Sequence, residues 1–342
     1  MRTLVISDLH LGARLRNSVL TRPEPLRALL GALDGVQRLV LLGDIVELME
    51  RRGSEAMEEA EPVLRAIGER LGPDREVIVV PGNHDRPLVG GWLRAHLPVV
   101  APDSAVPLDA SAPLAALVSS LRPARVRAHY PGVWLGERVW ATHGHYLDRH
   151  LLPESAFGIA RGRRDRWPCA AATPEQYELR GAGSSITRIE ALLTRSLPRP
   201  LAALVEDLAE LLRAATMPGV PKRLFHRRLA PLHAMALGLQ MRRASIPAVL
   251  RVALSLAIDA DWVLFGHVHR LGPLEGDRAL QWQGAGGQPM VANTGSWVYE
   301  PLLVHNAAPP HPYWPGGAVV LEPGRAPRAV GLLDDLEAGL LH

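Results

Sequence analysis

The chain is best understood from one stretch, VIVVPGNHD, which runs from Val77 to Asp85. Its first four residues are apolar and β-branched, and a Pro-Gly pair ends them, so we expect a buried strand that opens into a tight loop. The loop carries an amide, an imidazole and a carboxylate on consecutive residues, Asn83, His84 and Asp85. Because a strand end holds its side chains with little positional freedom, the pattern favours a chemical site over a plain polar turn.

Strand and helix signals alternate along the first part of the chain. Strands are expected at 3–6, 36–42 and 77–80. Helices are expected at 21–33, where Thr21 is the N-cap, and at 54–71, where Pro62 introduces a kink or break. This alternation is typical of a mainly parallel sheet with helical connections.

The rest of the chain divides into irregular, strand-rich and helical parts. We expect irregular connections with one short helix over 99–121, then two strands at 125–130 and 137–142 joined near Pro131. Residues 151–259 carry capping boxes and amphipathic helix patterns but almost no strand signal, so we interpret them as a helical insertion. Strands resume at 262–265, followed by a hairpin of 280–283 with 290–292 and by strands at 317–321 and 328–332.

Composition narrows the class of protein. With 342 residues, 47% hydrophobic and 21% charged, the chain is globular in composition and has room for one large domain or two smaller ones. A formal net charge of +3 is too small to indicate a nucleic-acid partner. Cys169 is the sole cysteine, which favours a reducing compartment.

The sequence also bears on where the protein acts. The sequence contains no run of about 18 apolar residues, so we expect no membrane span. The strand at 3–6 leaves no room for a signal peptide. We therefore expect a cytoplasmic protein, with the insertion as the part that would make peripheral contact with the inner face of a membrane.

Five predicted strands end in residues of the kinds that ligate metals. They are Asp8 and His10; Asp44; Asn83 and His84; His143; and His267 and His269. Residues i and i+2 of an extended segment point the same way, and parallel-sheet proteins gather their sites at the carboxyl ends of strands, so these side chains should converge. Carboxylates, imidazoles and an amide suit Mn²⁺, Fe, Zn²⁺ or Mg²⁺ and exclude a thiolate site.

Asp44 is the candidate for a bridging ligand. Two ions roughly 3.5–4 Å apart need a carboxylate between them, and an isolated aspartate at a strand end suits that role. Such ions clamp a phosphoryl group and lower the pKa of a bridging water, which yields a hydroxide nucleophile at neutral pH. His84 would stay off the metals, held by Asp85, and protonate the leaving oxygen.

The blocks Asp-x-His, Gly-Asp, Gly-Asn-His-Asp, His-Gly-His and Gly-His-x-His, in this order, resemble the calcineurin-like metallophosphoesterase family. The resemblance implies two divalent metal ions, with Mn²⁺ favoured and Fe, Zn²⁺, Mg²⁺ or Ni²⁺ as alternatives. The implied ligands are Asp8, His10, Asp44 and His269 for the first metal, and Asp44, Asn83, His143 and His267 for the second. The implied catalytic residues are His84 and Asp85, while His145 would either support a metal ligand or face the substrate.

The resemblance also implies a fold and a division of the chain. The expected fold is a four-layer α/β/β/α sandwich of two mixed sheets, with residues 1–150 and 260–342 as the core and 151–259 as a helical lid. This placement is similar to that in the UDP-2,3-diacylglucosamine hydrolase-like members of the family, although the insertion is longer. Two arginine clusters in it are candidates for binding an anionic substrate, with solvated surface as the alternative. They include Arg163, Arg164, Arg227 and Arg228.

Together these features predict hydrolysis of a phosphoester or pyrophosphate bond in a small or lipid-linked substrate, by a metal-bridging hydroxide with a histidine general acid. A nuclease-type phosphodiesterase and a protein phosphatase are alternatives, disfavoured by the weak net charge and by the expected lid. A non-catalytic binding or scaffold protein would be expected to have lost metal ligands, whereas all the expected positions are present. The substrate, the native metals and the oligomeric state stay open.

Overall fold

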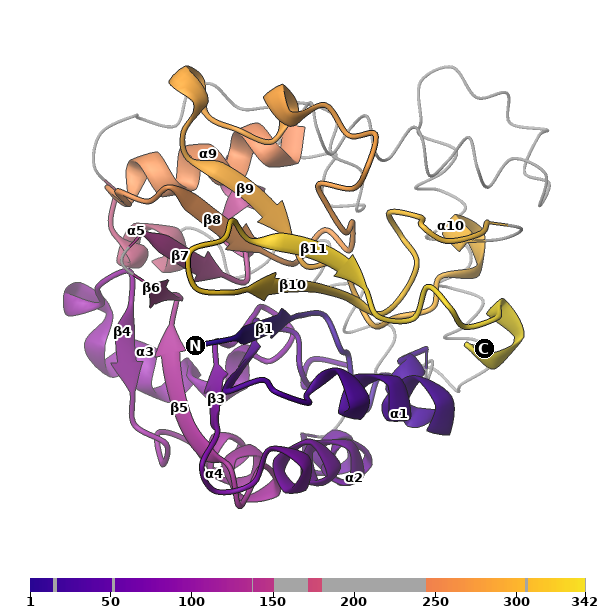
Figure 1. Ribbon diagram of the computed structural model, residues 1–342. Helices are drawn as coiled ribbons and strands as arrows, with labels where there is room; N and C mark the ends of the chain where they lie inside the picture. The colour runs from indigo at the N-terminus through magenta and orange to yellow at the C-terminus, as the bar shows by residue number, and fades with distance from the viewer. Residues whose placement is uncertain are drawn as a thin grey trace, which may run out of the picture.

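The computed structural model describes residues 1–14, 17–50, 53–136, 138–150, 172–179, 244–304 and 307–341. Within them the chain forms two β-sheets that pack face to face, with helices on their outer sides (Figure 1). One sheet has seven strands in the order β11-β10-β1-β2-β3-β5-β4, and the other has four in the order β6-β7-β8-β9. The expected α/β fold with two mixed sheets is therefore confirmed.

The seven-stranded sheet is parallel at its centre. The parallel strands are β1 (Thr3–Ile6), β2 (Arg38–Leu41), β3 (Glu76–Val79) and β5 (Arg125–Tyr130). The strands that pair antiparallel with their neighbours are β10 (Gly317–Leu321), β11 (Arg328–Gly331) and β4 (Ser104–Val106). Between the first three strands run α1 (Pro23–Ala32) and α2 (Gly53–Leu71), as the alternation of signals in the sequence predicts.

The four-stranded sheet begins in the chain directly after β5 of the seven-stranded sheet. Its strands are β6 (Gly132–Gly136), β7 (Val139–Thr142), β8 (Trp262–Phe265) and β9 (Met290–Asn293). β6 pairs antiparallel with β7, while β7, β8 and β9 are parallel. The other α-helices among the described residues are α3 (Gly90–His96), α4 (Ala112–Ser120), α5 (Pro174–Leu179), α9 (Ile246–Ser255) and α10 (Pro301–Val304). Short 3₁₀ turns include η2 (Arg86–Leu88) and η4 (His145–His150).

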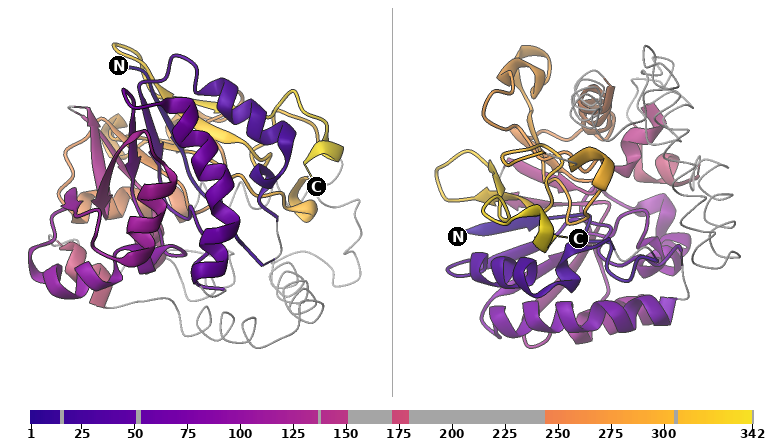
Figure 2. Two further views of the ribbon diagram at one scale, coloured as in Figure 1. Left: turned by 90° about the horizontal axis from the view of Figure 1, so that it is seen from below. Right: turned by 90° about the vertical axis from the view of Figure 1, so that its right-hand side faces the viewer.

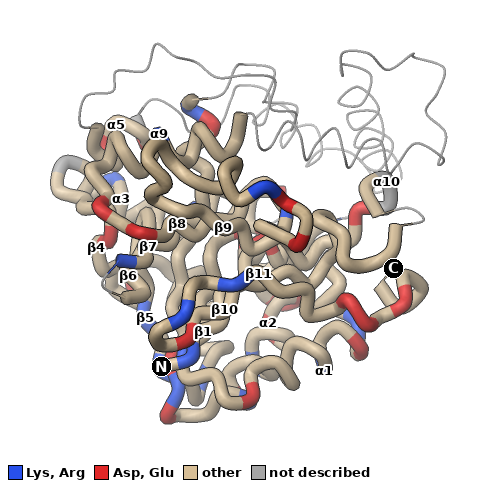
Figure 3. Tube along the Cα trace, turned by 45° about the horizontal axis from the view of Figure 1, so that its top comes forward, with Lys and Arg blue, Asp and Glu red and all other residues tan. Residues whose placement is uncertain are grey.

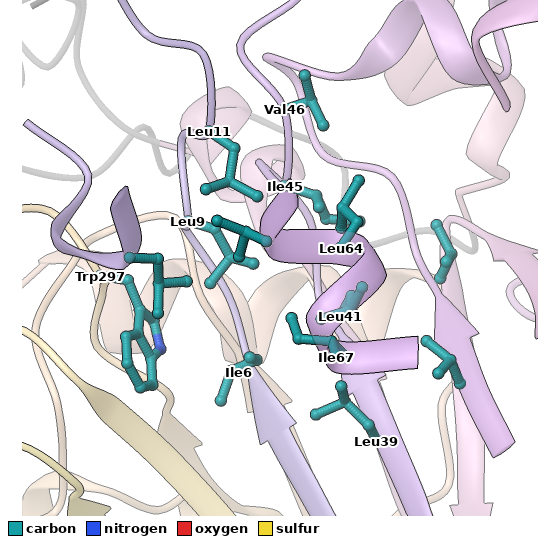
Figure 4. Packing of buried hydrophobic residues seen from close by; sticks show 14 of the residues in the cluster. Ile6, Leu9, Leu11, Leu39, Leu41, Ile45, Val46, Leu64, Ile67 and Trp297 are labelled. Carbon is teal, nitrogen blue, oxygen red and sulfur yellow. The ribbon is translucent and has the colours of Figure 1, made fainter. Parts of the chain in front are cut away.

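The central strands are buried on both faces, and alternate residues of each strand face different layers. Val5 and Val40 pack between the two sheets, in one cluster with Leu264 of β8. Leu41 points to the opposite side and packs with Leu64 of α2 (Figure 4). Because both faces are buried, these strands appear in the sequence as unbroken apolar runs.

Helices complete the layers on both sides of the paired sheets. α1, α2 and α4 cover the outer face of the seven-stranded sheet, and α9 covers the four-stranded sheet (Figures 1 and 2). Val249 and Val252 of α9 pack in one cluster with Trp140 of β7 and Phe265 of β8. Of the predicted insertion at 151–259, the structure describes 172–179 and 244–259, so its boundaries and its role as a lid stay predictions.

Several local expectations differ from the structure. Thr21 ends a 3₁₀ turn, Val19–Thr21, and α1 begins at Pro23 with Arg22 as its N-cap. Pro62 lies inside α2 without breaking it, because buried residues on both sides of it hold the helix against the sheet. Residues 99–121 contain an edge strand, β4, as well as the expected short helix, α4.

The strands near Pro131 and the expected hairpin also differ from the sequence prediction in detail. The strands expected at 125–130 and 137–142 are present as β5 and β7, but a further strand, β6, lies between them, and β5 joins the larger sheet while β6 and β7 join the smaller one. The expected hairpin of 280–283 with 290–292 is a single bridge between Gln283 and Met290. β9 pairs instead in parallel with β8, which buries Val291 beneath α9.

The described surface carries charges of both signs. Figure 3 shows basic and acidic positions interspersed along the described chain rather than gathered into one field. No helix among the described residues is long and apolar enough to cross a membrane.

Glu76 at the start of β3 provides a pH-dependent test of the fold. It accepts a hydrogen bond from Nε of Arg38 at 2.7 Å and lies 2.6 Å from Nε of Arg127. Burial alone would raise the pKa of Glu76, but the two arginines outweigh it and lower that pKa below its ordinary value of 4.5. The ionised side chain therefore stabilises the folded state above pH 4.5, and this contribution is lost as the pH falls through the lowered pKa.

We expect Glu76→Gln to lower the free energy of unfolding by about 1 kcal/mol or less at neutral pH. The difference from wild type should shrink in acid, where wild-type Glu76 is protonated too. Denaturant unfolding at neutral pH and at about pH 3 measures both values, with the exposed Glu69→Gln as control. A difference that persists undiminished in acid would contradict this account.

Candidate metal centre

The candidate residues follow the carboxyl ends of strands in both sheets. Asp8 and Asp44 come two and three residues after β1 and β2, and His143 comes directly after β7. β1, β2 and β3 are parallel in one sheet, and β7 and β8 are parallel in the other. The packing of the two sheets brings these strand ends together, as the sequence predicts.

The backbone at these positions is unusual. Among the described residues, six that are not glycine have positive φ, and five of them are candidate ligands. The five are Asp8 (φ 55°), His10 (44°), Asp44 (51°), His267 (69°) and His269 (55°). A left-handed conformation costs a residue with a side chain of the order of 1–3 kcal/mol, and such strain gathers at functional sites. The chain therefore turns sharply at each strand end, where it presents these side chains.

Among the described residues three groups of side chains could each hold a metal ion: one, His10 with Glu47 and His84, shares His10 with the first of the two that contain the predicted ligands. In the first group, the ligand atoms of Asp8, His10 and His269 all lie within 4.8 Å of one another. In the second, those of Asp44, His143 and His267 do so. Nε2 of His143 also lies 3.1 Å from Oδ1 of Asn83, so the amide predicted from the sequence adjoins the second group.

Asp44 lies between the two groups. Its Oδ2 is 3.2 Å from Nε2 of His143 and 3.8 Å from Nε2 of His10. Space around it is tight, since a Cβ added at Gly82 would collide with Oδ1 of Asp44 and come within 2.8 Å of Cδ2 of His143. A glycine at this position is thus needed for the loop to approach Asp44.

Each of the four histidines in the two groups has one ring nitrogen beside a hydrogen-bond acceptor, which leaves the second ring nitrogen for a metal ion. The contacts join His10 Nδ1 to Glu47 Oε2 at 3.1 Å, His143 Nδ1 to the Leu42 carbonyl at 3.0 Å, His267 Nε2 to Asp148 at 3.1 Å and His269 Nδ1 to Glu300 Oε1 at 3.0 Å. This is the arrangement by which metal-binding histidines are oriented, with the free nitrogen turned to the ion. Glu47, Asp148 and Glu300 escaped the sequence analysis because only the fold brings them to these rings.

The electrostatics of the site fit a cation. Burial would raise the pKa of Asp44, but the charges of His143 and His84 outweigh it and hold that pKa well below 3.8. Burial would lower the pKa of His143, but Asp44 raises it to about 9. Protons on histidines thus balance the buried carboxylates, and divalent ions would replace those protons.

The donor atoms agree with that conclusion. Among the described residues, Nε2 of His10 is buried without a hydrogen-bond partner, although it points towards Asp44. Carboxylate oxygens and imidazole nitrogens together suit Mn²⁺, Zn²⁺ and Fe. The residues present therefore fit divalent metal ions.

The loop with His84 differs from the sequence prediction in one respect. The Asp85 carboxylate accepts hydrogen bonds from the backbone N–H groups of Ile45 (2.7 Å) and Gly82, so it braces the loop instead of holding His84. The carboxylate beside His84 is Glu47, whose Oε2 lies 2.6 Å from Nδ1 of His84. A carboxylate adjacent in sequence was the wrong choice because Asp85 turns beneath the loop, where backbone donors meet it.

His145 and the arginines complete the set of predicted residues. The His145 ring lies 5.6 Å from that of His143, and its Nε2 contacts the Tyr130 hydroxyl at 3.1 Å, so it adjoins the second group. Whether His145 supports a metal ligand or faces the substrate therefore stays a prediction. Arg163, Arg164, Arg227 and Arg228 lie outside the described residues.

The comparisons with known proteins agree with this geometry. A family model for calcineurin-like phosphoesterases matches residues 1–271. The chain belongs to this family of metal-dependent phosphoesterases and is accordingly a hydrolase. A search of curated proteins found no significant match.

Solved structures similar to the chain include a cold-active protein tyrosine phosphatase from the psychrophile Shewanella sp. That match has 14% identity and a TM-score of 0.31, and it covers 96% of this chain and 80% of the other. A mutant described as a cold-active protein tyrosine phosphatase gives 14% identity, the same coverage and a TM-score of 0.30. Likeness of this degree carries no argument about the substrate of this chain.

Proposed function

We propose that the chain hydrolyses a phosphoester or pyrophosphate bond in a small or lipid-linked substrate, with two divalent metal ions bound around Asp44. The position of Asp44 supports this most directly, because one carboxylate oxygen lies 3.2 Å from a histidine of one group and 3.8 Å from a histidine of the other. A shared carboxylate is what a pair of ions about 4 Å apart requires.

The ligands would divide between the ions as the family resemblance implies. One ion would take Asp8, His10, Asp44 and His269, and the other Asp44, Asn83, His143 and His267. When bound, the ions supply Lewis-acid polarisation of the phosphoryl oxygens and acidify a water molecule. Mn²⁺ is the ion we propose first.

The chain itself would supply the proton for the leaving group. His84 is one-third exposed, whereas Glu47 beside its Nδ1 is buried, so Glu47 orients the ring from the protein side. Burial would lower the pKa of His84, but Glu47 and Asp44 outweigh it and raise that pKa well above 6.5. A protonated His84 can give its Nε2 proton to the departing oxygen. The backbone N–H of His84 also donates to Oδ1 of Asp44 at 2.9 Å, which holds the residue that carries the acid beside the proposed bridging carboxylate.

The substrate class rests on the position of the insertion in the chain. It lies between His143 and His267, so both of its ends start near the site. We propose that it covers the site and contacts the part of the substrate that does not react. Its arginines suit phosphate or another anionic group, and its apolar helix patterns suit a lipid chain.

A substrate panel tests the proposed function. The metal-free protein would be reconstituted with Mn²⁺ and assayed on p-nitrophenyl phosphate, bis-p-nitrophenyl phosphate, nucleoside diphosphate sugars, a lipid-linked diphosphate and DNA. We expect metal-dependent turnover of a diester or pyrophosphate, fastest for the lipid-linked compound. Absence of turnover with two ions bound would overturn the proposal, and preferential cleavage of DNA would replace it with the nuclease alternative.

Charge reversal at Arg163 and Arg164 tests the role of the insertion. We expect Arg163→Glu with Arg164→Glu to raise KM for an anionic substrate more than it lowers kcat, because uniform binding is lost. The matched control reverses Arg122 and Arg325, which lie by the opposite ends of the strands, before β5 and after β10. Unchanged KM in the first variant would assign these arginines to solvated surface.

A further inference from the structure

A buried polar cluster adjoins the metal centre and includes one helix of the insertion. Its centre is Glu178 on α5, whose side chain is only 4% exposed. Around it lie Arg86, directly after the loop that carries His84, Tyr130 at the end of β5, and Tyr146 on η4. None of these residues ligates a metal in the proposed function.

The Glu178 carboxylate uses both of its oxygens. Oε2 accepts from Nη2 of Arg86 at 2.6 Å and from Nε at 3.2 Å. Oε1 accepts from the hydroxyl of Tyr146 at 2.9 Å and from the hydroxyl of Tyr130. A buried carboxylate is thus matched by one cation and two hydroxyl donors, which makes its position specific.

The helix that carries Glu178 is fixed from two other sides. The Tyr177 ring stacks on that of Tyr146, with centroids 4.7 Å apart and planes inclined by 4°. The backbone N–H of Ala172 donates to the carbonyl of Ser255 in α9 at 2.7 Å. α5 therefore sits at a defined place beside η4 and the end of α9.

This cluster determines which nitrogen of His145 carries the proton. A tyrosine hydroxyl has one proton, and that of Tyr130 is donated to Glu178. The Tyr130 oxygen must then accept from Nε2 of His145, 3.1 Å away, so Nε2 bears the hydrogen. Nδ1 of His145 is left as an acceptor, and it is buried without a hydrogen-bond partner in the described part of the chain.

We propose that Glu178 is a positioning residue, which acts through Tyr130 to hold His145 with Nδ1 as an acceptor beside the metal centre and acts through Arg86 to hold the loop of His84. This role in catalysis rests on the proposed function, whereas the protonation of His145 does not.

The first test reads the protonated nitrogen directly. Protein labelled with ¹⁵N-histidine and loaded with Zn²⁺ or Mg²⁺, which are diamagnetic, gives long-range ¹H–¹⁵N spectra that separate the two neutral forms of imidazole. His145→Gln assigns the signal by its loss. We expect Nε2–H in the wild type and a gain of Nδ1–H in Tyr130→Phe. Nδ1–H in the wild type, or an unchanged spectrum in Tyr130→Phe, would overturn the proposal.

The second test separates positioning from simple stability. Tyr130→Phe frees His145 but keeps the pair of Glu178 with Arg86, while Glu178→Gln places an amide where Arg86 needs an anion. The matched control is Glu175→Gln on the same helix. We expect both cluster variants to keep two bound ions and to lose about 10–100-fold in kcat/KM, the usual effect of outer partners of a metal site.

The two proposals fail in different ways. If the wild type hydrolysed no phosphoester, the proposed function would fail while the spectra of His145 would still be informative. If Tyr130→Phe and Glu178→Gln kept full kcat/KM on a substrate that the wild type hydrolyses, the positioning role would be wrong and the proposed function would stand. A loss of bound metal equal to the loss of activity would likewise overturn the positioning role.

Discussion

Asp44→Asn should remove most of the bound metal and nearly all of the hydrolytic activity. Asp44 is the carboxylate between the two groups of ligands, so its loss weakens both ions rather than one. We expect a decrease in kcat/KM well beyond the roughly 10–100-fold that outer partners of a metal site cause. Metal content by mass spectrometry and turnover of a chromogenic diester measure the two effects on one preparation.

The control for this variant is Asp74→Asn, an exposed aspartate that precedes β3 at the opposite edge of the sheet. It should keep both ions and full activity. Thermal unfolding of both variants shows whether a loss of metal is local or follows from unfolding. Two tightly held ions in a folded Asp44→Asn would show that this carboxylate does not bridge.

His84→Ala should leave both ions in place and lower kcat by about 10²–10⁴-fold, the usual contribution of general acid catalysis. His84 contacts Glu47 and, through its backbone N–H, Asp44, and its ring is outside both groups of proposed ligands, although His10, Glu47 and His84 form a third group with the same close spacing. The loss should be large for a leaving group that needs a proton and small for p-nitrophenol. The exposed His96→Ala serves as control.

The dependence on the leaving group decides the role of His84. Equal losses for good and poor leaving groups would mean that His84 acts on binding or on the ions instead of protonating the leaving oxygen. Glu47→Gln adds a second comparison, because it keeps His84 but removes the charge beside Nδ1; its metal content is measured as well, since Glu47 also contacts the proposed ligand His10. It should show a smaller loss with the same dependence on the leaving group.

The parallel strands and the set of candidate metal ligands could be predicted, because both depend on patterns of a few neighbouring residues in the sequence. Apolar runs such as Val77–Val80 end in the candidate residues, and parallel strands gather those ends whatever the details of the helices between them. The assignment of strands to two separate sheets came from the family resemblance, since nothing local at Pro131 shows that the chain passes from one sheet to the other there.

The partners of the candidate residues could not be predicted in the same way. Glu47 lies 37 residues from His10 in sequence, and Glu178 lies 48 from Tyr130, so only the folded chain makes these pairs. For His84, proximity in sequence favoured Asp85, but the backbone donors of Ile45 and Gly82 occupy that carboxylate. Hydrogen-bond partners depend on orientation, which residue spacing does not determine.

The most direct test of the central claim is anomalous X-ray diffraction from crystals of the protein loaded with Mn²⁺. The proposed pair of ions around Asp44 predicts two manganese peaks roughly 3.5–4 Å apart, one on each side of the Asp44 carboxylate. One peak would be bounded by Asp8, His10 and His269, and the other by Asn83, His143 and His267. A single peak, or two peaks that do not share Asp44, would contradict it.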